Sequence, residues 1–279
     1  MTTSSSSSKQ TPPERNALVR MIDVHKSFGD LVVLDGLELE LRRGETTVII
    51  GESGSGKSVI LNHIVRLLRP DRGEVHYDGV RIDNLSERKL AGIRSRFGFL
   101  FQLSALFDSL TVGDNVAFPI RQHTKLSRAK VAEVVSRKLT MVGLDGIQSK
   151  RPAELSGGQK KRVALARAIA LDPELILYDE PTTGLDPPRA DVINELIIKL
   201  KRELGVTSVV VTHDMASANK VADRVLMLYG GKFIFDGTPK SMAASDDPRV
   251  RQFIEGRATD EDMASLRGDG HVPIGGNRQ

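Results

Sequence analysis

The chain has 279 residues, of which 39% are hydrophobic and 27% charged, a composition typical of a soluble globular protein large enough for one big domain or two lobes. Its net charge of +4 is too small to indicate a nucleic-acid partner, and the lack of cysteine excludes disulfides and thiolate metal sites. The longest apolar runs are far shorter than the roughly 20 residues that cross a bilayer. We therefore expect a cytoplasmic protein with no nucleic-acid ligand.

The two ends of the chain are predicted to differ from the folded part. Residues 1–18 are rich in serine and lack the apolar stretch of a secretory signal, which predicts a disordered tail. Residues 241–279 contain one short pattern, VRQFIEG, followed by a polar, glycine-rich stretch, which predicts a partly disordered C-terminal extension. The folded domain is expected over residues 19–240.

Two kinds of strand are predicted. From Leu18 to Arg43, and again from Glu74, apolar and polar residues alternate, and Asp78-Gly79 marks a turn, so these segments favour a small antiparallel sheet. Shorter, almost wholly apolar runs are typical of a parallel sheet that is buried on both faces. These runs are Thr46–Ile50, Leu175–Tyr178, Ser208–Thr212 and Val225–Leu228.

Helical patterns connect these strands. Residues from about 103 to 170 predict a separate helical lobe, with breaks at Pro119, Gly143 and Pro152. A further helix is bracketed by Pro187 at its start and Gly205 at its end. Its apolar face is assigned to Val192, Leu196, Leu200 and Leu204.

The stretch GESGSGKS matches the pattern G-x-x-x-x-G-K-[ST] of a phosphate-binding P-loop. Its glycines allow successive backbone N–H groups to face a phosphate chain, and the helix that starts near Lys57 adds its positive end. Lys57 is predicted to reach the β- and γ-phosphates of ATP and Ser58 to ligate Mg²⁺, whereas the Glu52 side chain points outward. The predicted nucleotide contacts here are Gly51, Glu52, Ser53, Gly54, Ser55, Gly56, Lys57 and Ser58.

Two carboxylates, Asp179 and Glu180, end the apolar run LILYDE. Carboxylates at a strand end are costly if they are buried without partners. We therefore predict that Asp179 holds the water shell of Mg²⁺, and that Glu180 orients or deprotonates an attacking water. The alternative is an ordinary acidic turn in solvent.

The third motif is LSGGQKKRVALARAIA, from Leu155 to Ala170. With the P-loop and LILYDEPTTGLDP, it makes the chain from about Val19 to Pro239 resemble the ABC-type ATPases, the nucleotide-binding subunits of ATP-driven transporters. The resemblance implies an α/β fold of the P-loop NTPase type, with an antiparallel β subdomain and a helical subdomain. It also implies ATP and Mg²⁺ as cofactors, and ATP hydrolysis as the reaction.

The signature LSGGQ opens a helix, so its serine and glycines offer a hydroxyl, bare N–H groups and a positive helix end. The resemblance implies a head-to-tail dimer, in which this segment of one copy completes the site of the other. The residues expected to do so are Ser156, Gly157, Gly158 and Gln159. After them, Lys160, Lys161 and Arg162 are assigned to the solvent face of the helix, and Val163, Ala166 and Ile169 to its apolar face.

Further positions acquire roles from the resemblance. Phe28 matches the aromatic residue that stacks on adenine, and a plain core phenylalanine is the alternative. Gln102 matches the glutamine that reaches Mg²⁺ and the water. Asp186 matches the residue that touches the opposite subunit, and His213 the histidine that bonds the γ-phosphate. The expected catalytic set is thus Glu180, His213 and Gln102, and the expected metal set is Ser58, Gln102 and Asp179.

Several phrases, among them SALFDSLTVGDNVAFPIR, are similar to the Mla/Mce-type lipid-transport ATPases of bacterial envelopes. Gln159 departs from the methionine that is frequent in that group. This resemblance implies a peripheral ATPase on the cytoplasmic face of the inner membrane, driving a phospholipid permease. Further partners would be an Mce-domain protein and a small regulatory subunit, which the C-terminal segment could contact. The substrate is not determined by these residues.

The segment from Gln102 to Leu110 is expected to form the groove for the permease. Its apolar residues suit permease contacts and the core of the helical lobe equally, and they are Leu103, Leu106, Phe107 and Leu110. The rival functions are an ATPase subunit for an amino-acid or metal importer, and a non-transport ABC protein acting on ribosomes or DNA. The absence of a long insertion between Lys57 and Ser156 argues against the second rival. Intact Glu180 and His213 argue against a binding subunit without turnover.

Overall fold

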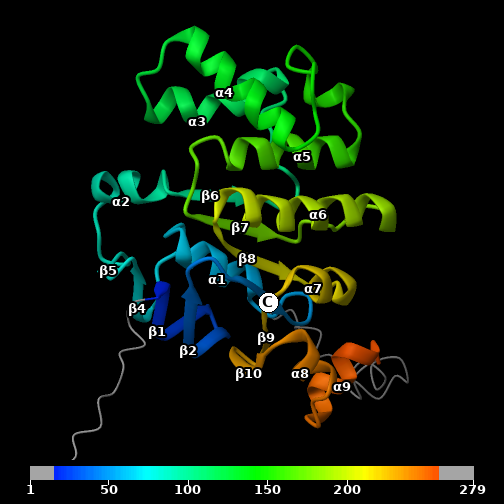
Figure 1. Cartoon of the computed structure of the whole chain (residues 1–279). Helices are drawn as coiled ribbons and strands as arrows, with labels where there is room; N and C mark the ends of the chain where they lie inside the picture. Colours follow the sequence, from blue (N-terminus) through cyan, green and yellow to red (C-terminus); the bar gives the residue numbers. More distant parts are fainter. Residues whose placement is uncertain (1–15, 258–279) are drawn as a thin grey trace, which may run out of the picture.

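The computed structural model describes residues 16–257, and its elements stack in layers from an antiparallel sheet at one end to a group of helices at the other (Figure 1). The predicted tail up to residue 15, and the glycine-rich stretch after residue 257, lie outside the described residues. The first strand begins at Ala17, two residues before the expected start of the folded domain, because Leu18 is already buried in the core.

The predicted antiparallel sheet is present, with strand order β2-β1-β4-β5. Val19 lies opposite Leu41 on one side and Tyr77 on the other, so the alternating apolar residues share one buried face. The turn at Asp78-Gly79 has positive φ angles of 51° and 76°, which suits a tight hairpin. The strands are β1 (Ala17–Phe28), β2 (Leu31–Arg42), β4 (Arg72–Tyr77) and β5 (Val80–Arg81).

The second sheet has the order β10-β9-β3-β8-β7-β6, and every neighbouring pair in it is parallel except β10 with β9. All four predicted apolar runs are strands of this sheet, and the prediction missed the strands at its two edges, β6 and β10. Because the parallel strands run the same way, their carboxyl ends meet at one edge. The strands are β3 (Thr46–Ile50), β6 (Phe97–Leu100), β7 (Leu175–Asp179), β8 (Thr207–Thr212), β9 (Arg224–Tyr229) and β10 (Lys232–Gly237).

Helix α1 (Lys57–Ile64) fills the space between the two sheets. Its side chains Ile60, Leu61 and Ile64 are fully buried and join one hydrophobic cluster with residues of both sheets. Burying three large aliphatic side chains stabilises this arrangement by about 1.5–3 kcal/mol each. The packing therefore fixes the start of α1 against the carboxyl end of β3, where the nucleotide motif lies.

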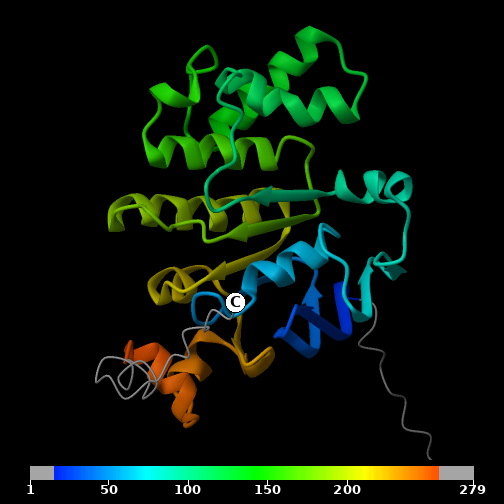
Figure 2. The ribbon, with the colours of Figure 1, turned by 180° about the vertical axis from the view of Figure 1, so that it is seen from behind.

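The helical region is built on the other face of the second sheet (Figure 2). Pro119 lies inside α3 and does not break it, so the predicted break there is wrong; the helix continues although this position has no N–H to donate. Gly143 and Pro152 do mark helix boundaries. Helix α2 (Glu87–Arg94) does not belong to this region, because its buried Leu90 joins the hydrophobic cluster of α1 and the antiparallel sheet. The elements of the helical region are α3 (Val112–His123), α4 (Arg128–Met141), η2 (Pro152–Glu154) and α5 (Gly157–Ala168).

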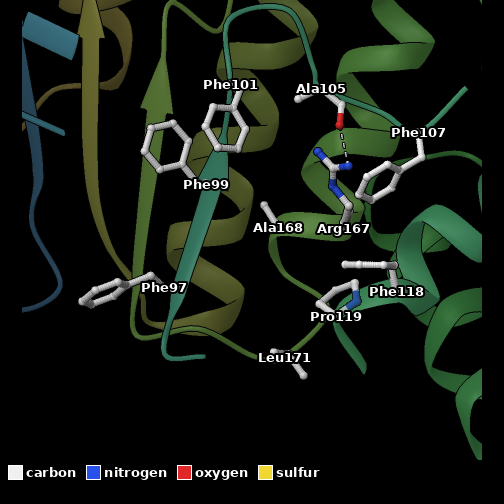
Figure 3. Close-up of a pocket in the computed structure, with 10 residues that line it drawn as sticks. All are labelled: Phe97, Phe99, Phe101, Ala105, Phe107, Phe118, Pro119, Arg167, Ala168 and Leu171. Atoms are coloured by element: carbon white, nitrogen blue, oxygen red, sulfur yellow. Dashed lines mark hydrogen bonds between the residues drawn. The ribbon is translucent and has the colours of Figure 1, made fainter. Parts of the chain in front are cut away.

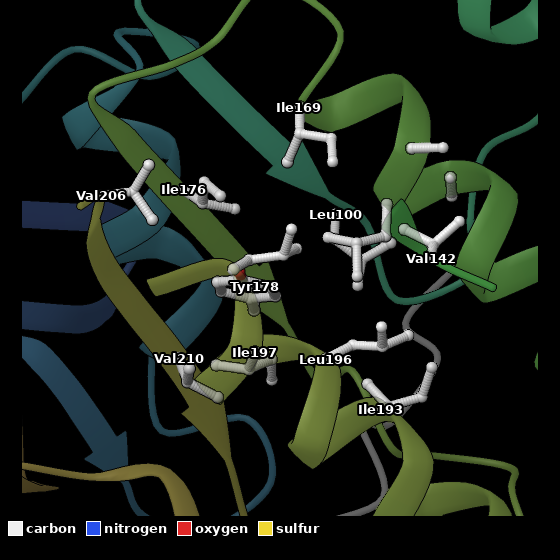
Figure 4. Close-up of a cluster of buried hydrophobic side chains, with 14 of the residues drawn as sticks. Leu100, Val142, Ile169, Ile176, Tyr178, Ile193, Leu196, Ile197, Val206 and Val210 are labelled. Atoms are coloured by element: carbon white, nitrogen blue, oxygen red, sulfur yellow. The ribbon is translucent and has the colours of Figure 1, made fainter. Parts of the chain in front are cut away.

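One hydrophobic cluster joins these helices to the sheet, so the helical region does not have a core of its own. Figure 4 shows Val142 and Ile169 from the helical region facing Leu100, Ile176 and other strand residues across the same buried space. A shared core of this kind resists free rotation of the helical region, because separation would expose apolar surface.

Helix α6 (Pro187–Leu204) begins and ends as predicted, and Gly205 takes a left-handed conformation with φ of 63°. Its predicted apolar face was partly wrong. Val192 is 47% exposed, because the helix turns Ile193 and Ile197 toward the core beside Leu196 and Leu200.

The remaining helices are α7 (Met215–Val221), α8 (Pro239–Ala243) and α9 (Pro248–Glu255). Helix α8 spans the expected boundary at residue 240, and Met242 and Val250 belong to the main hydrophobic cluster. The first part of the C-terminal segment is therefore packed on the domain. Among residues 16–257, we find no helix with the length and apolar character that crossing a membrane requires.

Candidate active site

The P-loop connects β3 to α1 at the carboxyl edge of the second sheet. Gly51, Gly54 and Gly56 have φ angles of 155°, 81° and 104°, a range that side chains disfavour. A Cβ atom on Gly51 would lie 2.6 Å from the Leu228 carbonyl oxygen, and one on Gly56 would lie 2.6 Å from Val33 Cγ1. These two glycines are thus required by both conformation and space.

Lys57 is buried at the first position of α1. Its ammonium donates hydrogen bonds to the carbonyls of Gly51 at 2.8 Å and Glu52 at 2.7 Å, which are part of the loop that it follows. Burial lowers the pKa of this ammonium, and the nearby carboxylates oppose that shift. The Glu52 side chain is exposed, in keeping with the expectation that only its backbone faces the ligand.

Ser58 and Asp179 meet across the carboxyl ends of β3 and β7. The Ser58 hydroxyl donates to Asp179 Oδ1 at 2.7 Å. Burial raises the pKa of the Asp179 carboxyl, although the Ser58 hydrogen bond acts in the opposite direction. A hydroxyl beside a carboxylate is an oxygen donor set of the kind that Mg²⁺ takes with phosphates and water, so these residues fit that ion.

Glu180 follows Asp179 in a left-handed conformation, with φ of 47°, and only 8% of its surface is exposed. Its N–H donates to the Val211 carbonyl at 3.0 Å, which holds the residue against β8. One carboxylate oxygen lies 3.0 Å from His213 Nδ1, and the other accepts a hydrogen bond from Thr183 Oγ1 at 3.1 Å. The acidic-turn alternative is therefore wrong, because Glu180 is buried and its carboxylate has fixed partners.

A cavity of about 370 Å³ joins half of the predicted site residues. Phe28 lines it and is 47% exposed, so this ring does not belong to the hydrophobic core, which was the alternative. Gln102 comes just after β6 at the same sheet edge. The lining residues are Phe28, Val33, Ser53, Gly54, Gly56, Lys57, Ser58, Val59, Gln102, Glu180 and His213. Val33 and Val59 had not been predicted, since an apolar residue of a strand or helix carries no signal for a ligand.

The signature segment lies elsewhere in the chain. Ser156, Gly157, Gly158 and Gln159 are at the start of α5, in the helical region and away from α1 in both views (Figures 1 and 2). Ser156 Oγ accepts a hydrogen bond from the Gln159 N–H at 3.3 Å, and Gln159 Oε1 accepts one from the Ser156 N–H at 2.9 Å. This reciprocal cap satisfies two backbone donors and leaves the serine O–H able to donate.

Asp186 is likewise outside the cavity. Its carboxylate caps α6 by accepting a hydrogen bond from the Arg189 N–H at 3.0 Å, and the side chain is 48% exposed. Within one copy of the chain, Asp186 and the signature therefore lie outside the P-loop cavity, on other parts of the surface.

The assignment of Lys161 to the solvent face of α5 was wrong. Lys161 is 5% exposed and packs on the buried side of the helix with Ala164 and Leu165. Its ammonium donates to the carbonyls of Gln102 at 3.0 Å and Glu180 at 3.2 Å. Helical spacing could have revealed this position, because residues three and four positions apart share one face. The apolar assignments of Val163, Ala166 and Ile169 are confirmed by their full burial.

Comparison with known proteins identifies the family to which these motifs belong. A family model described as "ABC transporter" matches residues 34–183. The MlaF intermembrane phospholipid transport ATP-binding protein of Escherichia coli (strain K12) is 44% identical over 257 residues, 92% of each chain. The probable ribonucleotide transport ATP-binding protein mkl of Mycobacterium leprae (strain TN) is 43% identical over 232 residues, which cover 83% of this chain and 67% of that protein.

A solved structure agrees in fold. The ATP-binding cassette MJ0796, in a dimeric post-hydrolysis state bound to ADP and Pi, superposes with a TM-score of 0.73 at 35% identity, covering 79% of this chain and 98% of that one. The P-loop cavity, the carboxylates at the end of β7 and the signature helix are thus parts of an ATP-hydrolysing cassette. This chain belongs to the family of ABC transporter ATPases.

Proposed function

We propose that two copies of this chain associate head-to-tail and hydrolyse two ATP molecules held between them. The observation that carries the proposal is the separation of the two anion sites. The P-loop cavity is lined by Lys57 and Glu180, whereas the exposed, capped signature at Ser156 lies on a different part of the same chain. A second copy turned by a two-fold axis brings its Ser156 to the cavity of the first, which one chain alone does not do.

In this proposal, the backbone of the P-loop and Lys57 bind the phosphates, and Phe28 stacks on the adenine. Mg²⁺, held by Ser58 and Gln102 with Asp179 behind its water shell, would neutralise charge on the phosphates. Glu180 accepts the proton of the attacking water, and His213 fixes that carboxylate while it bonds the γ-phosphate. Thr183 adds a second hydrogen bond to Glu180, so the carboxylate is oriented before the nucleotide arrives.

A mixing experiment tests the shared site. Neither Ser156→Arg nor Lys57→Ala should hydrolyse ATP alone, because each homodimer has two damaged sites. Mixed in equal amounts, they should recover about a quarter of the wild-type rate, since half of the dimers are mixed and each of these has one intact site. Phosphate release at saturating ATP measures the recovery. No recovery on mixing contradicts the head-to-tail geometry.

An apolar groove favours a membrane permease as the next partner (Figure 3). The cavity, of about 430 Å³, lies between the segment after β6 and helices α3 and α5. Figure 3 shows Phe101, Phe107 and Phe118 facing it. Leu103 is 90% exposed and Phe107 is 42% exposed, whereas Leu106 packs partly against the core. An exposed apolar groove marks an interaction site, so Phe107, which lines it, is assigned to the permease. Leu103 is assigned to the permease as an exposed apolar residue of the same segment, and Leu106 to the core.

We infer that the cargo of this transporter is a phospholipid or related lipid, and that the subunit acts at the cytoplasmic face of the cell membrane. The supporting observation is the 44% identity to an MlaF protein over 92% of both chains. A ribonucleotide transporter is the second candidate, since the mkl relative has 43% identity over a shorter part of its own length. An importer for amino acids or metals has no such support among these relatives.

Purification from native membranes separates these candidates. A permease accompanied by an Mce-domain protein supports lipid transport, and a permease without one, together with ribonucleotide uptake by proteoliposomes, supports the alternative. The same preparation tests for a small regulatory subunit. The end of the C-terminal segment, predicted to contact such a partner, lies outside the described residues.

A further inference from the structure

Lys161 is the one lysine of the neighbouring pair Lys160 and Lys161 that turns away from solvent. It is the fifth residue of α5, on the face that carries the fully buried Ala164 and Leu165. Placing an ammonium there costs free energy unless it is hydrogen-bonded. Burial lowers the pKa of Lys161, while the charges of Glu180 and Asp179 oppose that shift. The position therefore requires acceptors, and the structure supplies two.

Both acceptors are backbone carbonyls of predicted site residues. The ammonium donates to Gln102 at 3.0 Å and to Glu180 at 3.2 Å. Gln102 follows strand β6, and Glu180 follows strand β7, which pairs with β6 in the sheet. Lys161 therefore bridges the carboxyl ends of two adjacent strands. Glu180 has a positive φ of 47°, a conformation that costs a non-glycine residue of order 1–3 kcal/mol and persists only when its surroundings hold it.

Another cation of α5 holds the continuation of the same loop. Arg167 donates to the carbonyls of Ser104 at 2.9 Å and Ala105 at 2.7 Å. Figure 3 shows the Arg167 guanidinium directed at Ala105 beside the apolar groove. Ser104 and Ala105 also have positive φ angles, of 64° and 46°. Helix α5 thus holds this loop at two places, and of these two cations Lys161 also bonds to Glu180.

We propose that Lys161 is a positioning residue for ATP hydrolysis, tying Gln102 and Glu180 to the helix that begins with the signature. It touches the carbonyls of these residues and leaves their side chains free for the nucleotide and water. Lys161 thus couples the position of α5, which begins with the signature, to the backbone of the two residues whose side chains orient the water. The inference rests on the proposed roles of Gln102 and Glu180.

The test compares steady-state ATP hydrolysis by the full-length chain and its Lys161→Met variant. Misplacement of catalytic groups lowers kcat with little effect on nucleotide binding, so kcat should fall by about 100-fold while the KM for ATP stays within about 3-fold. Lys161→Arg keeps a buried donor and should restore a substantial part of the rate. Lys161→Gln provides a second neutral variant, in case methionine prevents folding.

Lys138→Met is the matched control. Lys138 is 1% exposed, lies in α4 of the same helical region, and pairs with Asp172 outside the cavity. Its loss should lower the melting temperature but leave kcat per folded molecule unchanged. Equal losses of kcat in Lys138→Met and Lys161→Met would show that Lys161 matters only for folding, and would overturn the inference. So would a Lys161→Met enzyme within 2-fold of the wild-type kcat.

Two further variants separate this inference from the proposed function. Gln102→Ala and Lys161→Met should combine less than multiplicatively, because both act through the same loop; a fully multiplicative loss contradicts the link. Glu180→Gln should be inactive in parallel assays. If it retains turnover, the proposed role of Glu180 is wrong; if it is inactive while Lys161→Met is active, only the role of Lys161 is wrong.

Discussion

The P-loop and the signature are both built around a helix start, yet their local chemistry differs. Helix α1 has no side-chain cap, since its N-cap residue is Gly56, and Lys57 turns back over the loop. Helix α5 is capped reciprocally by Ser156 and Gln159. The first site has a buried lysine and glutamate, Lys57 and Glu180, and is completed by groups from neighbouring strands. The second site is exposed, and its capping groups bond to each other. In the proposed dimer, the P-loop half of the shared site is therefore formed within one chain, and we call it the prepared half. The signature half would acquire its ligand only when a partner copy is present.

The largest effect in this comparison is expected at the prepared half. Glu180→Gln removes the base but keeps the shape of the side chain, so turnover should fall by about 10³-fold. ATP binding should remain, because the P-loop is untouched, and the variant should accumulate as an ATP-dependent dimer. Phosphate release and light scattering measure the two outcomes. A Glu180→Gln chain that stays monomeric at saturating ATP contradicts the assigned role.

A smaller effect is expected at the signature. Ser156→Ala removes a helix cap, which costs about 1 kcal/mol, and also removes the hydroxyl offered to the partner. Turnover should therefore fall by about 100-fold, as for the loss of a single donor to a reacting anion. Calorimetry and steady-state rates at saturating ATP give both values.

Ser127→Ala is the matched control for this variant, because Ser127 caps α4 through a bond of the same length, 3.3 Å, from the Lys130 N–H. It should lose similar stability and no turnover. Equal kinetic losses in the two variants would mean that Ser156 acts only as a helix cap.

The smallest effect concerns the stability of the prepared half. Burial raises the pKa of Asp179 in the folded chain, so the folded state favours the protonated form. The contribution of the Asp179 carboxyl to the stability of the fold is therefore present in acid, and it is lost as the pH rises through this raised pKa. Asp179→Asn should therefore raise the melting temperature of the nucleotide-free chain at neutral pH.

This gain from Asp179→Asn should shrink as the pH is lowered, because the wild-type carboxyl then becomes neutral as well. Thermal unfolding between about pH 4 and 8, a range that begins near the ordinary carboxyl pKa, follows the difference between the two chains. If the difference in melting temperature between the two chains is constant across this pH range, ionisation of the Asp179 carboxyl does not cause it.

The local pattern of apolar, proline and glycine residues was sufficient to predict most helices and strands. The four apolar runs are strands of the second sheet, and the bounds of α6 follow from Pro187 and Gly205. Where the prediction failed, packing had decided against local preference. Pro119 sits within α3, although proline usually ends a helix, and Val192 faces solvent, although its neighbours in the pattern are buried.

The sequence by itself determined the P-loop, the signature, the two carboxylates and the family they indicate, because each of these motifs lies within a few consecutive residues. Only the tertiary structure decided that Glu180 pairs with His213, that Lys161 is buried against two strand ends, and that the two anion sites lie apart. These contacts join residues far apart in the chain. They depend on how strands order and helices pack, which no local spacing specifies.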